Sequence, residues 1–314
     1  MQSNKTAIVN RNLLARTAAR LFARPEERER FELAFTDCNP DQMLSAAIWV
    51  HELPDCGTVA WTSSCARILS SDERRRLQGR HDAGEVYFFD PSSLFCISAL
   101  HEVESLETPI VLDLCSAPGG KGIYAWRYFT GPQIIANEVS QGRIPALISN
   151  LKRCRVAPVG VTTREAKFFA QRTPHCFGLT IVDAPCSGQS LLLKEIKNPG
   201  CFHPMTIRKN SLRQKQILSN AAETVMPGGY LLYSTCTFSS EENEEVIEWF
   251  LKRFAHFAVV PVQHLEQYRT QITGEACYRL YPWQGGAGGF TALLRNNGVG
   301  EAQGLPDLQF CWSS

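Results

Sequence analysis

The sequence predicts an α/β protein with a doubly wound sheet, preceded by a smaller and mostly helical region. Two observations support this prediction. From about residue 107 onwards, short apolar runs alternate with helical segments, and continuous apolar runs are typical of strands covered on both faces. Before about residue 105, alanine, leucine and phenylalanine recur at helical spacing, most clearly over residues 12–35. Alternation of strands and helices predicts a sheet with parallel strands.

The predicted elements follow one another in a regular order. Strands are expected at residues 110–115, 134–139, 159–163, 179–185 and 228–236. Helices are expected at residues 97–105, 121–129, 141–154, 206–225 and 240–254. Two closing strands are expected at residues 257–262 and 289–295. The chain is therefore divided into an N-terminal helical region at 1–105, a main domain at 106–298 and a tail at 299–314.

The composition excludes several classes of protein. The chain has 314 residues, 44% of them hydrophobic, which is enough for one large and one small domain. No apolar run reaches the roughly 18 residues of a membrane span, and the N-terminus lacks the apolar core of a secretory signal. The 12 cysteines are scattered without a CxxC pair, so we expect free thiols in a reducing cytoplasm and no bound metal.

The net charge of +1 does not by itself indicate a polyanionic partner. Local basic segments, such as residues 11–30 and 72–81, can still hold phosphates. Each of them is explained equally well as a solvated helix face.

The first three strand ends carry residues suited to a nucleoside-like ligand, since ligands of such sheets bind at the carboxyl ends of the strands. The first strand ends in DLCSAPGGKG, residues 113–122, a tight turn whose following helix offers amide groups to an anion. It matches neither GxGxxG nor a GK[ST] ending, which disfavours a nucleoside triphosphate. Glu138 after the second strand can accept hydrogen bonds from ribose hydroxyls. Glu165 after the third can face a base edge, or be a solvated loop residue.

The fourth and fifth strands each deliver a cysteine to the same edge. Asp183 and Cys186 follow the fourth strand, and Cys236 follows the fifth. Neighbouring strands lie roughly 5 Å apart, so adjacency of these two strands would bring both thiols and the acid into one cleft. Either cysteine alone is explained as well by packing in a core. The pair, beside an acid and a nucleoside-shaped site, favours chemistry.

Several ordered motifs carry a family resemblance. These are LDLCSAPGGKG (112–122), ANEVS (136–140), VDAPCSGQ (182–189) and PGGYLLYSTCTFSSEENEEVI (227–247), with GEVYFFDPSSLF (84–95) before them. Together they resemble the Nop/Sun family of RNA cytosine-5 methyltransferases over about residues 84–295. The resemblance implies a Rossmann-like methyltransferase sheet, S-adenosylmethionine as cofactor, and RNA as substrate.

The resemblance also implies roles for individual residues. The methionine end of the cofactor would lie against the loop made of Cys115, Ser116, Ala117, Pro118, Gly119, Gly120 and Lys121. Glu138 would bind the ribose, and Glu165, where the family more often has Asp, would contact the adenine. Arg143 joins the cofactor-binding candidates. Cys236 corresponds to the attacking cysteine, Cys186 to the cysteine that assists product release, and Asp183 lies near both cofactor and base.

The chemistry explains why two thiols are needed. Carbon 5 of cytosine is a poor nucleophile, and addition of a thiolate to carbon 6 makes it enamine-like, which is covalent catalysis. We expect Cys236 to be this nucleophile, with a pKa lowered by its surroundings. Asp183, in its protonated form, would support ring nitrogen 3 as charge builds there. Cys186 would help the adduct to break.

The substrate is predicted less closely than the chemistry. The target base must be unpaired or flipped, and Phe88, Phe89 and Arg213 are candidates to stack on it. The basic N-terminal region would hold phosphates. Ribosomal RNA is preferred and transfer RNA is compatible; we expect a monomer without a membrane partner.

The chain departs from the family pattern in residues 189–194, in the segment GAGGF and at Trp283, where a histidine is commoner. Two alternatives therefore stay open. One is methylation of DNA or of a small molecule, and the other is an RNA-binding assembly factor with a degenerate catalytic site.

Overall fold

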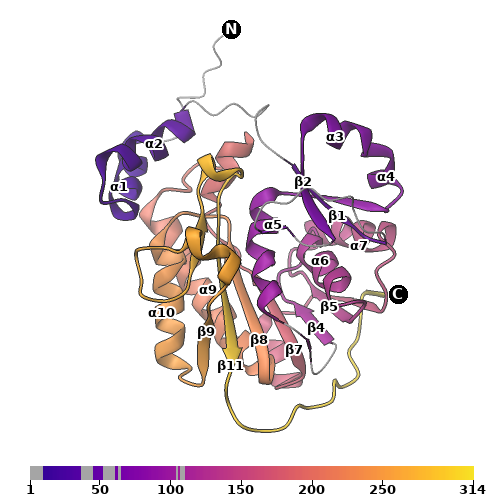
Figure 1. Cartoon of the computed structure of the whole chain (residues 1–314). Helices are drawn as coiled ribbons and strands as arrows, with labels where there is room; N and C mark the ends of the chain where they lie inside the picture. The colour runs from indigo at the N-terminus through magenta and orange to yellow at the C-terminus, as the bar shows by residue number, and fades with distance from the viewer. Residues whose placement is uncertain (1–9, 37–44, 52–60, 63–64, 104, 107–109) are drawn as a thin grey trace.

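The computed structural model of the chain describes residues 10–36, 45–51, 61–62, 65–103, 105–106 and 110–314 (Figure 1). Parts of the predicted N-terminal region, such as residues 1–9 and 52–60, lie outside the described residues.

A doubly wound sheet forms the centre of the molecule, as predicted. The parallel strands are β4 (Ile110–Asp113), β5 (Gln133–Asn137), β6 (Val159–Thr162), β7 (Phe177–Asp183) and β8 (Val225–Thr235). They stand in the order β8-β7-β4-β5-β6, so the chain first builds outward from β4 on one side and then returns to build on the other. The strand order therefore reverses between β4 and β7, which is where a sheet of this kind binds its ligand.

Antiparallel strands extend both edges of this sheet. At one edge β8 pairs with β11 (Gly289–Asn296), which pairs in turn with β9 (Phe257–Val260) and β10 (Tyr278–Leu280). At the other edge β12 (Trp312–Ser313) pairs with β6. The two closing strands were predicted at β9 and β11. The short strands β10 and β12 were not.

Helices cover both faces of the sheet, which explains why its strands are apolar throughout. One face packs against α6 (Gly120–Tyr128), α7 (Ile144–Arg153) and α5 (Pro91–Ile97), and the other against α8 (Ala166–Arg172), α9 (Pro204–Thr224) and α10 (Glu244–Arg253). Successive residues of one strand serve opposite faces: Val111 belongs to the first cluster and Leu112 to the second, and both are fully buried. No helix among the described residues is long and apolar enough to cross a membrane.

Local sequence signals set where these helices begin. Asp90 caps α5 by accepting hydrogen bonds from the amides of Ser92 and Ser93, and Pro91 occupies the first helical position. In the same way, the His203 side chain accepts from the Met205 amide at the start of α9, and proline again follows the cap.

The N-terminal region is helical, as predicted, but it also holds a small sheet. The helix expected over residues 12–35 is two helices, α1 (Arg11–Leu21) and α2 (Pro25–Thr36), with a proline at the break. Two short helices, α3 (Ser71–Arg76) and α4 (Gln78–Asp82), follow further on, and the helix expected at 97–105 is α5 continued by the 3₁₀ turn η3 (Ser98–Glu102).

The unpredicted sheet is antiparallel, with the order β2-β1-β3. Its strands are β1 (Ser45–Trp49), β2 (Ala66–Leu69) and β3 (Val86–Phe89). These strands are as short as β4, β5 and β6, but they lack the regular alternation with helices that identified the strands of the main sheet.

The helical hairpin of α1 and α2 packs on loops at the carboxyl edge of the main sheet (Figure 1). Its buried Phe31 lies 5.1 Å, between ring centroids, from Phe238, two residues beyond Cys236. Leu193 and Trp283 belong to the same apolar cluster. These two residues lie in segments where the sequence departs from the family pattern, so the structure gives these departures a packing role against the hairpin.

Candidate active site

The predicted site residues gather at the carboxyl edge of β4, β5, β7 and β8, around two adjoining cavities. The first has a volume of about 330 Å³ and is lined by Cys115, Glu138, Arg143 and Glu165. The second, of about 260 Å³, also reaches Cys115. The other predicted site residues that line the second cavity are Ser116, Ala117, Pro118, Gly120, Lys121 and Asp183. Because Cys115 borders both, the β4 loop joins the two cavities into one site.

The glycines of the β4 loop are required by close packing. Gly119 has a φ of +106°, a left-handed conformation that favours glycine. A Cβ atom on Gly120 would lie 2.4 Å from a ring carbon of Phe89. A Cβ on Gly122 would lie 3.0 Å from the Asp113 carboxylate. Gly119 is the one predicted loop residue that lines neither cavity, and its role is to form the turn.

Asp113 was not predicted as a functional residue, although it is the first residue of the loop motif DLCSAPGGKG. Its side chain is buried and lines the second cavity. Ser116 donates a hydrogen bond to Oδ2 at 2.8 Å, while Oδ1 has no hydrogen-bond partner among the described residues. Burial raises the pKa of Asp113 to about 7. A buried carboxylate oxygen without a partner is suited to a cationic ligand group.

Glu138 is held ready for a ligand by its neighbours. Its Oε1 accepts a hydrogen bond from the Ser140 amide at 2.8 Å, and its Oε2 lies 3.1 Å from the Arg143 guanidinium. Arg143 also donates to the Ala117 carbonyl of the β4 loop. Arg143 therefore ties the acid to the loop. Glu165 stands immediately before α8 and lines the same cavity as Glu138.

An ion pair lies in the lining of the second cavity. The Lys121 ammonium lies 2.7 Å from Oδ2 of Asp183, and Ser234 donates to Oδ1 at 2.8 Å. Burial disfavours the charge of Lys121, but attraction by Asp183 and other acids gives a net rise in the pKa of its ammonium. Both Asp183 oxygens are acceptors here. The proton donation to nitrogen 3 that was expected of Asp183 stays a prediction.

The two predicted thiols meet beside this ion pair. Since Asp183 pairs with Ser234 in the register of β7 and β8, the residues that follow each strand lie side by side. The Cys186 and Cys236 sulfur atoms are 3.3 Å apart. Neither cysteine is among the residues that line the two cavities.

The environments of the two thiols differ, and the difference indicates which cysteine loses its proton first. The hydrogen bond from Cys186 lowers the pKa of Cys236, against the effect of burial, with help from Lys194 and Lys121. The same hydrogen bond, burial and Glu242 raise the pKa of Cys186 well above the usual thiol value. The pair therefore favours a thiolate at Cys236 and a thiol at Cys186.

The residues expected to stack on a base are only partly placed to do so. Phe88 and Phe89 both line the second cavity, but the Phe88 ring stacks on His81 with ring centroids 4.4 Å apart. Arg213 lines the first cavity, together with Pro185, the residue before Cys186. Lys194, which the sequence analysis passed over, lines the second cavity and pairs with Asp90 at 2.7 Å.

Comparison with known proteins gives consistent matches. A family model described as 16S rRNA methyltransferase RsmB/F matches residues 100–295. Ribosomal RNA small subunit methyltransferase F of Pectobacterium carotovorum is 32% identical over 201 residues, which cover 62% of this chain and 41% of that protein. The chain spans between 36% and 52% of the length of such curated relatives.

Solved structures share the fold. A methyltransferase homolog protein from Pyrococcus horikoshii has a TM-score of 0.71 at 23% identity, covering 90% of this chain and 94% of that one. NSun6 from Pyrococcus horikoshii, determined with SFG, has a TM-score of 0.59 at 23% identity, covering 69% of this chain and 55% of that one.

Proposed function

Since the chain belongs to the 16S rRNA methyltransferase RsmB/F family, we propose that it transfers a methyl group from S-adenosylmethionine to carbon 5 of a cytosine in ribosomal RNA. The family match confirms the resemblance found in the sequence motifs. The observation that carries the proposal is the pair of sulfur atoms 3.3 Å apart, beside a lysine–aspartate ion pair and a nucleoside-sized cavity.

The residues present fit S-adenosylmethionine. In the first cavity Glu138 and Glu165 offer two acids to ribose hydroxyls and to the adenine. In the second, the unpartnered Oδ1 of Asp113 suits the cationic methionine end. When bound, the cofactor supplies an electrophilic methyl group.

The protein's own residues then act in sequence on the base. The Cys236 thiolate forms a bond to carbon 6, which pushes electron density toward nitrogen 3 and carbon 5. Lys121 and Asp183 stabilise that density, with Lys121 as the proton source and Asp183 as the acceptor that orients it.

Product release reverses the addition. The proton on carbon 5 leaves to a solvent base, its electron pair restores the ring double bond, and the bond to Cys236 breaks to return a thiolate. Cys186 donates a hydrogen bond to that thiolate, since the two sulfur atoms are already 3.3 Å apart in the free protein. A better leaving group breaks from carbon faster, so Cys186 assists release.

A methyl-transfer assay on ribosomal RNA tests this function. The protein is expected to incorporate labelled methyl from S-adenosylmethionine into 5-methylcytosine, and RNase is expected to destroy the labelled product. Cys186→Ala should accumulate a covalent RNA–protein adduct, whereas Cys236→Ala should form none. Methylation of cytosine by Cys236→Ala would overturn the assignment of roles.

The same assay separates the remaining alternatives. We propose small-subunit ribosomal RNA as the substrate. Labelled methyl found only in transfer RNA would show that transfer RNA is the substrate instead. Label that survives RNase would indicate DNA or a small molecule. No uptake of S-adenosylmethionine by calorimetry would favour an assembly factor with a degenerate site. We further propose that the protein acts as a monomer in the cytoplasm.

The N-terminal hairpin is the proposed phosphate-binding element. Helix α1 has no acidic residue, and its Arg11 and Arg16 are exposed. Arg20 instead pairs with Glu241, close to the loop that follows Cys236. Phosphate contacts from this hairpin would position the RNA beside the site without reading its sequence.

A further inference from the structure

We propose that Asn243 and Glu242 are positioning residues that hold the two thiols at their working separation. Both side chains are fully buried, whereas the two cysteines are partly exposed, so neither Asn243 nor Glu242 is placed to touch the substrate. They lie where the 3₁₀ turn η6 (Ser240–Glu242) passes into α10. The proposal rests on the function proposed above, since it concerns the same two cysteines.

Asn243 clamps the chain on both sides of Cys236. The Thr235 hydroxyl donates to Oδ1 of Asn243 at 2.6 Å. The Nδ2 group of Asn243 donates to the Thr237 carbonyl at 3.0 Å. In addition, the Ser190 amide donates to the carbonyl of Cys236 itself at 3.1 Å. The backbone around Cys236 is therefore fixed before, at and after the cysteine.

Glu242 does the same for the chain around Cys186. Its Oε2 accepts from the Ser187 amide at 2.8 Å and from the Gln214 side chain at 3.0 Å. Gln214 also donates to the Pro185 carbonyl at 3.0 Å. Residues on both sides of Cys186 are thus connected to one buried carboxylate.

A direct contact then joins the two loops. The hydroxyl groups of Ser187 and Thr237, the residues that follow the two cysteines, are 2.7 Å apart. Because Glu242 and Asn243 are consecutive, any shift of this corner moves both thiol loops. We infer that the corner sets the distance and orientation of the two sulfur atoms.

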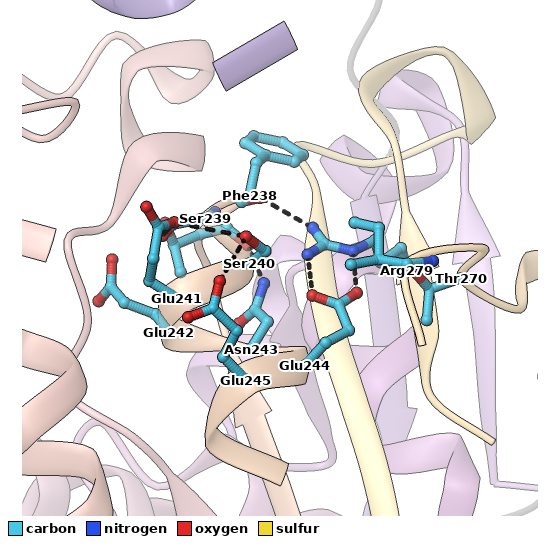
Figure 2. A network of polar contacts seen from close by, with 12 residues as sticks. Phe238, Ser239, Ser240, Glu241, Glu242, Asn243, Glu244, Glu245, Thr270 and Arg279 are labelled. Atoms are coloured by element: carbon cyan, nitrogen blue, oxygen red, sulfur yellow. Dashed lines mark hydrogen bonds and ion pairs between the residues drawn. The ribbon is translucent and has the colours of Figure 1, made fainter. Parts of the chain in front are cut away.

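A buried ion pair anchors the corner to the sheet (Figure 2). The Arg279 side chain, on β10, donates from Nε to Oε1 of Glu244 at 2.5 Å and from Nη1 to the Phe238 carbonyl at 3.0 Å. Arg279 and Glu244 are both almost inaccessible to solvent. The start of α10 and the end of the Cys236 loop are therefore held by the same guanidinium.

Asn243→Asp tests the clamp with almost no change of shape. Oδ1 can still accept from Thr235, but the donor to the Thr237 carbonyl becomes a carboxylate oxygen facing another oxygen. We expect kcat for methyl transfer to fall about 100-fold, because a displacement of about 1 Å at a reacting group has that effect. KM for RNA should stay unchanged, since Asn243 is not placed to touch RNA.

A second pair of variants keeps the test decisive if Asn243→Asp fails to fold. Thr235→Ser keeps the hydroxyl donor to Asn243 and should retain wild-type kcat. Thr235→Val has the same shape without the donor and should lower kcat with KM unchanged. Equal kcat for both variants would overturn the proposal.

Asn296→Asp is the matched control. Asn296 is also buried and also bridges two backbone groups, accepting from the Gly298 amide and donating to the Val225 carbonyl, each at 2.9 Å. It lies at the end of β11, away from the carboxyl edge of β7 and β8. We expect it to lower the melting temperature without lowering kcat. A fall in kcat equal to that of Asn243→Asp would reduce Asn243 to a merely structural role.

A measurement without RNA separates this proposal from the proposed function. Alkylation by iodoacetamide, with the two cysteine peptides quantified by mass spectrometry, reports the reactivity of each thiol. In wild type Cys236 should react faster than Cys186, and Asn243→Asp should reduce that preference. An unchanged preference would contradict the clamp. A wild-type protein that shows the preference but methylates no RNA would instead refute the function.

Discussion

The ion pair between Arg279 and Glu244 gives a quantitative prediction about stability. The two side chains are 2% and 1% exposed, so Arg279→Met would leave a carboxylate buried without a counter-charge. The Phe238 carbonyl would lose a donor at 3.0 Å as well. Removing one partner of a buried pair typically costs about 3–5 kcal/mol, and we expect that loss in the free energy of unfolding.

Calorimetry provides the assay. In a chain of this size, 1 kcal/mol corresponds to about 2–3 °C, so the melting temperature should fall by about 6–15 °C. The double variant Arg279→Met with Glu244→Met removes both charges and should recover much of that loss. A loss below about 1 kcal/mol, typical of exposed pairs, would refute the reasoning, as would a double variant no more stable than Arg279→Met.

Three further predictions concern the site. Because the pKa of Cys236 is lowered and that of Cys186 raised, alkylation measured against pH should reach half its maximum at lower pH for Cys236; the reverse order would contradict the assignment of the thiolate. Burial raises the pKa of Asp113 from 3.8 to about 7, so its charged form opposes folding, and stability should fall as pH rises from about 4 to 7. Asp113→Asn should make that decline in stability less steep, and it should weaken binding of S-adenosylmethionine in calorimetry. A decline as steep as in wild type would show that Asp113 does not cause it. Gly120→Ala places a Cβ 2.4 Å from the Phe89 ring and should cost about 1–3 kcal/mol in denaturant unfolding, whereas unchanged stability would show that the ring moves freely.

The sequence was informative about the main sheet because its signals are local and repeated. Each of the strands β4 to β8 is a short apolar run, and the structure confirms all five. A helical pattern was predicted after every one of them except β6, where the short helix α8 was not predicted. The small sheet of β1, β2 and β3 was not predicted because its strands do not alternate regularly with helices, although they are as long as β4, β5 and β6. The pairing of Trp312–Ser313 with β6 is a contact between distant parts of the chain, which no local pattern reveals.

Some features of the site could likewise be predicted from the sequence, and others could not. Parallel strands bring their ends together, so the proximity of Asp183, Cys186 and Cys236 could be predicted from the sequence, whereas the cleft that they were expected to share stays a prediction. The sequence did not show that Lys121 pairs with Asp183, because that contact depends on how the β4 loop turns.

The clamp formed by Asn243 was equally inaccessible, for a different reason. One of its partners is the backbone carbonyl of Thr237, a group that every residue carries. A hydrogen bond to such a group leaves no distinctive residue type for a sequence pattern to reveal.

Trapping the protein on ribosomal RNA that contains 5-fluorocytidine tests the central claim most directly. Fluorine cannot leave carbon 5 as a proton does, so the adduct formed by the attacking thiolate should persist. Mass spectrometry of the linked peptide should then identify Cys236 as the attached residue. Attachment at Cys186, or methylation without any adduct, would contradict the account.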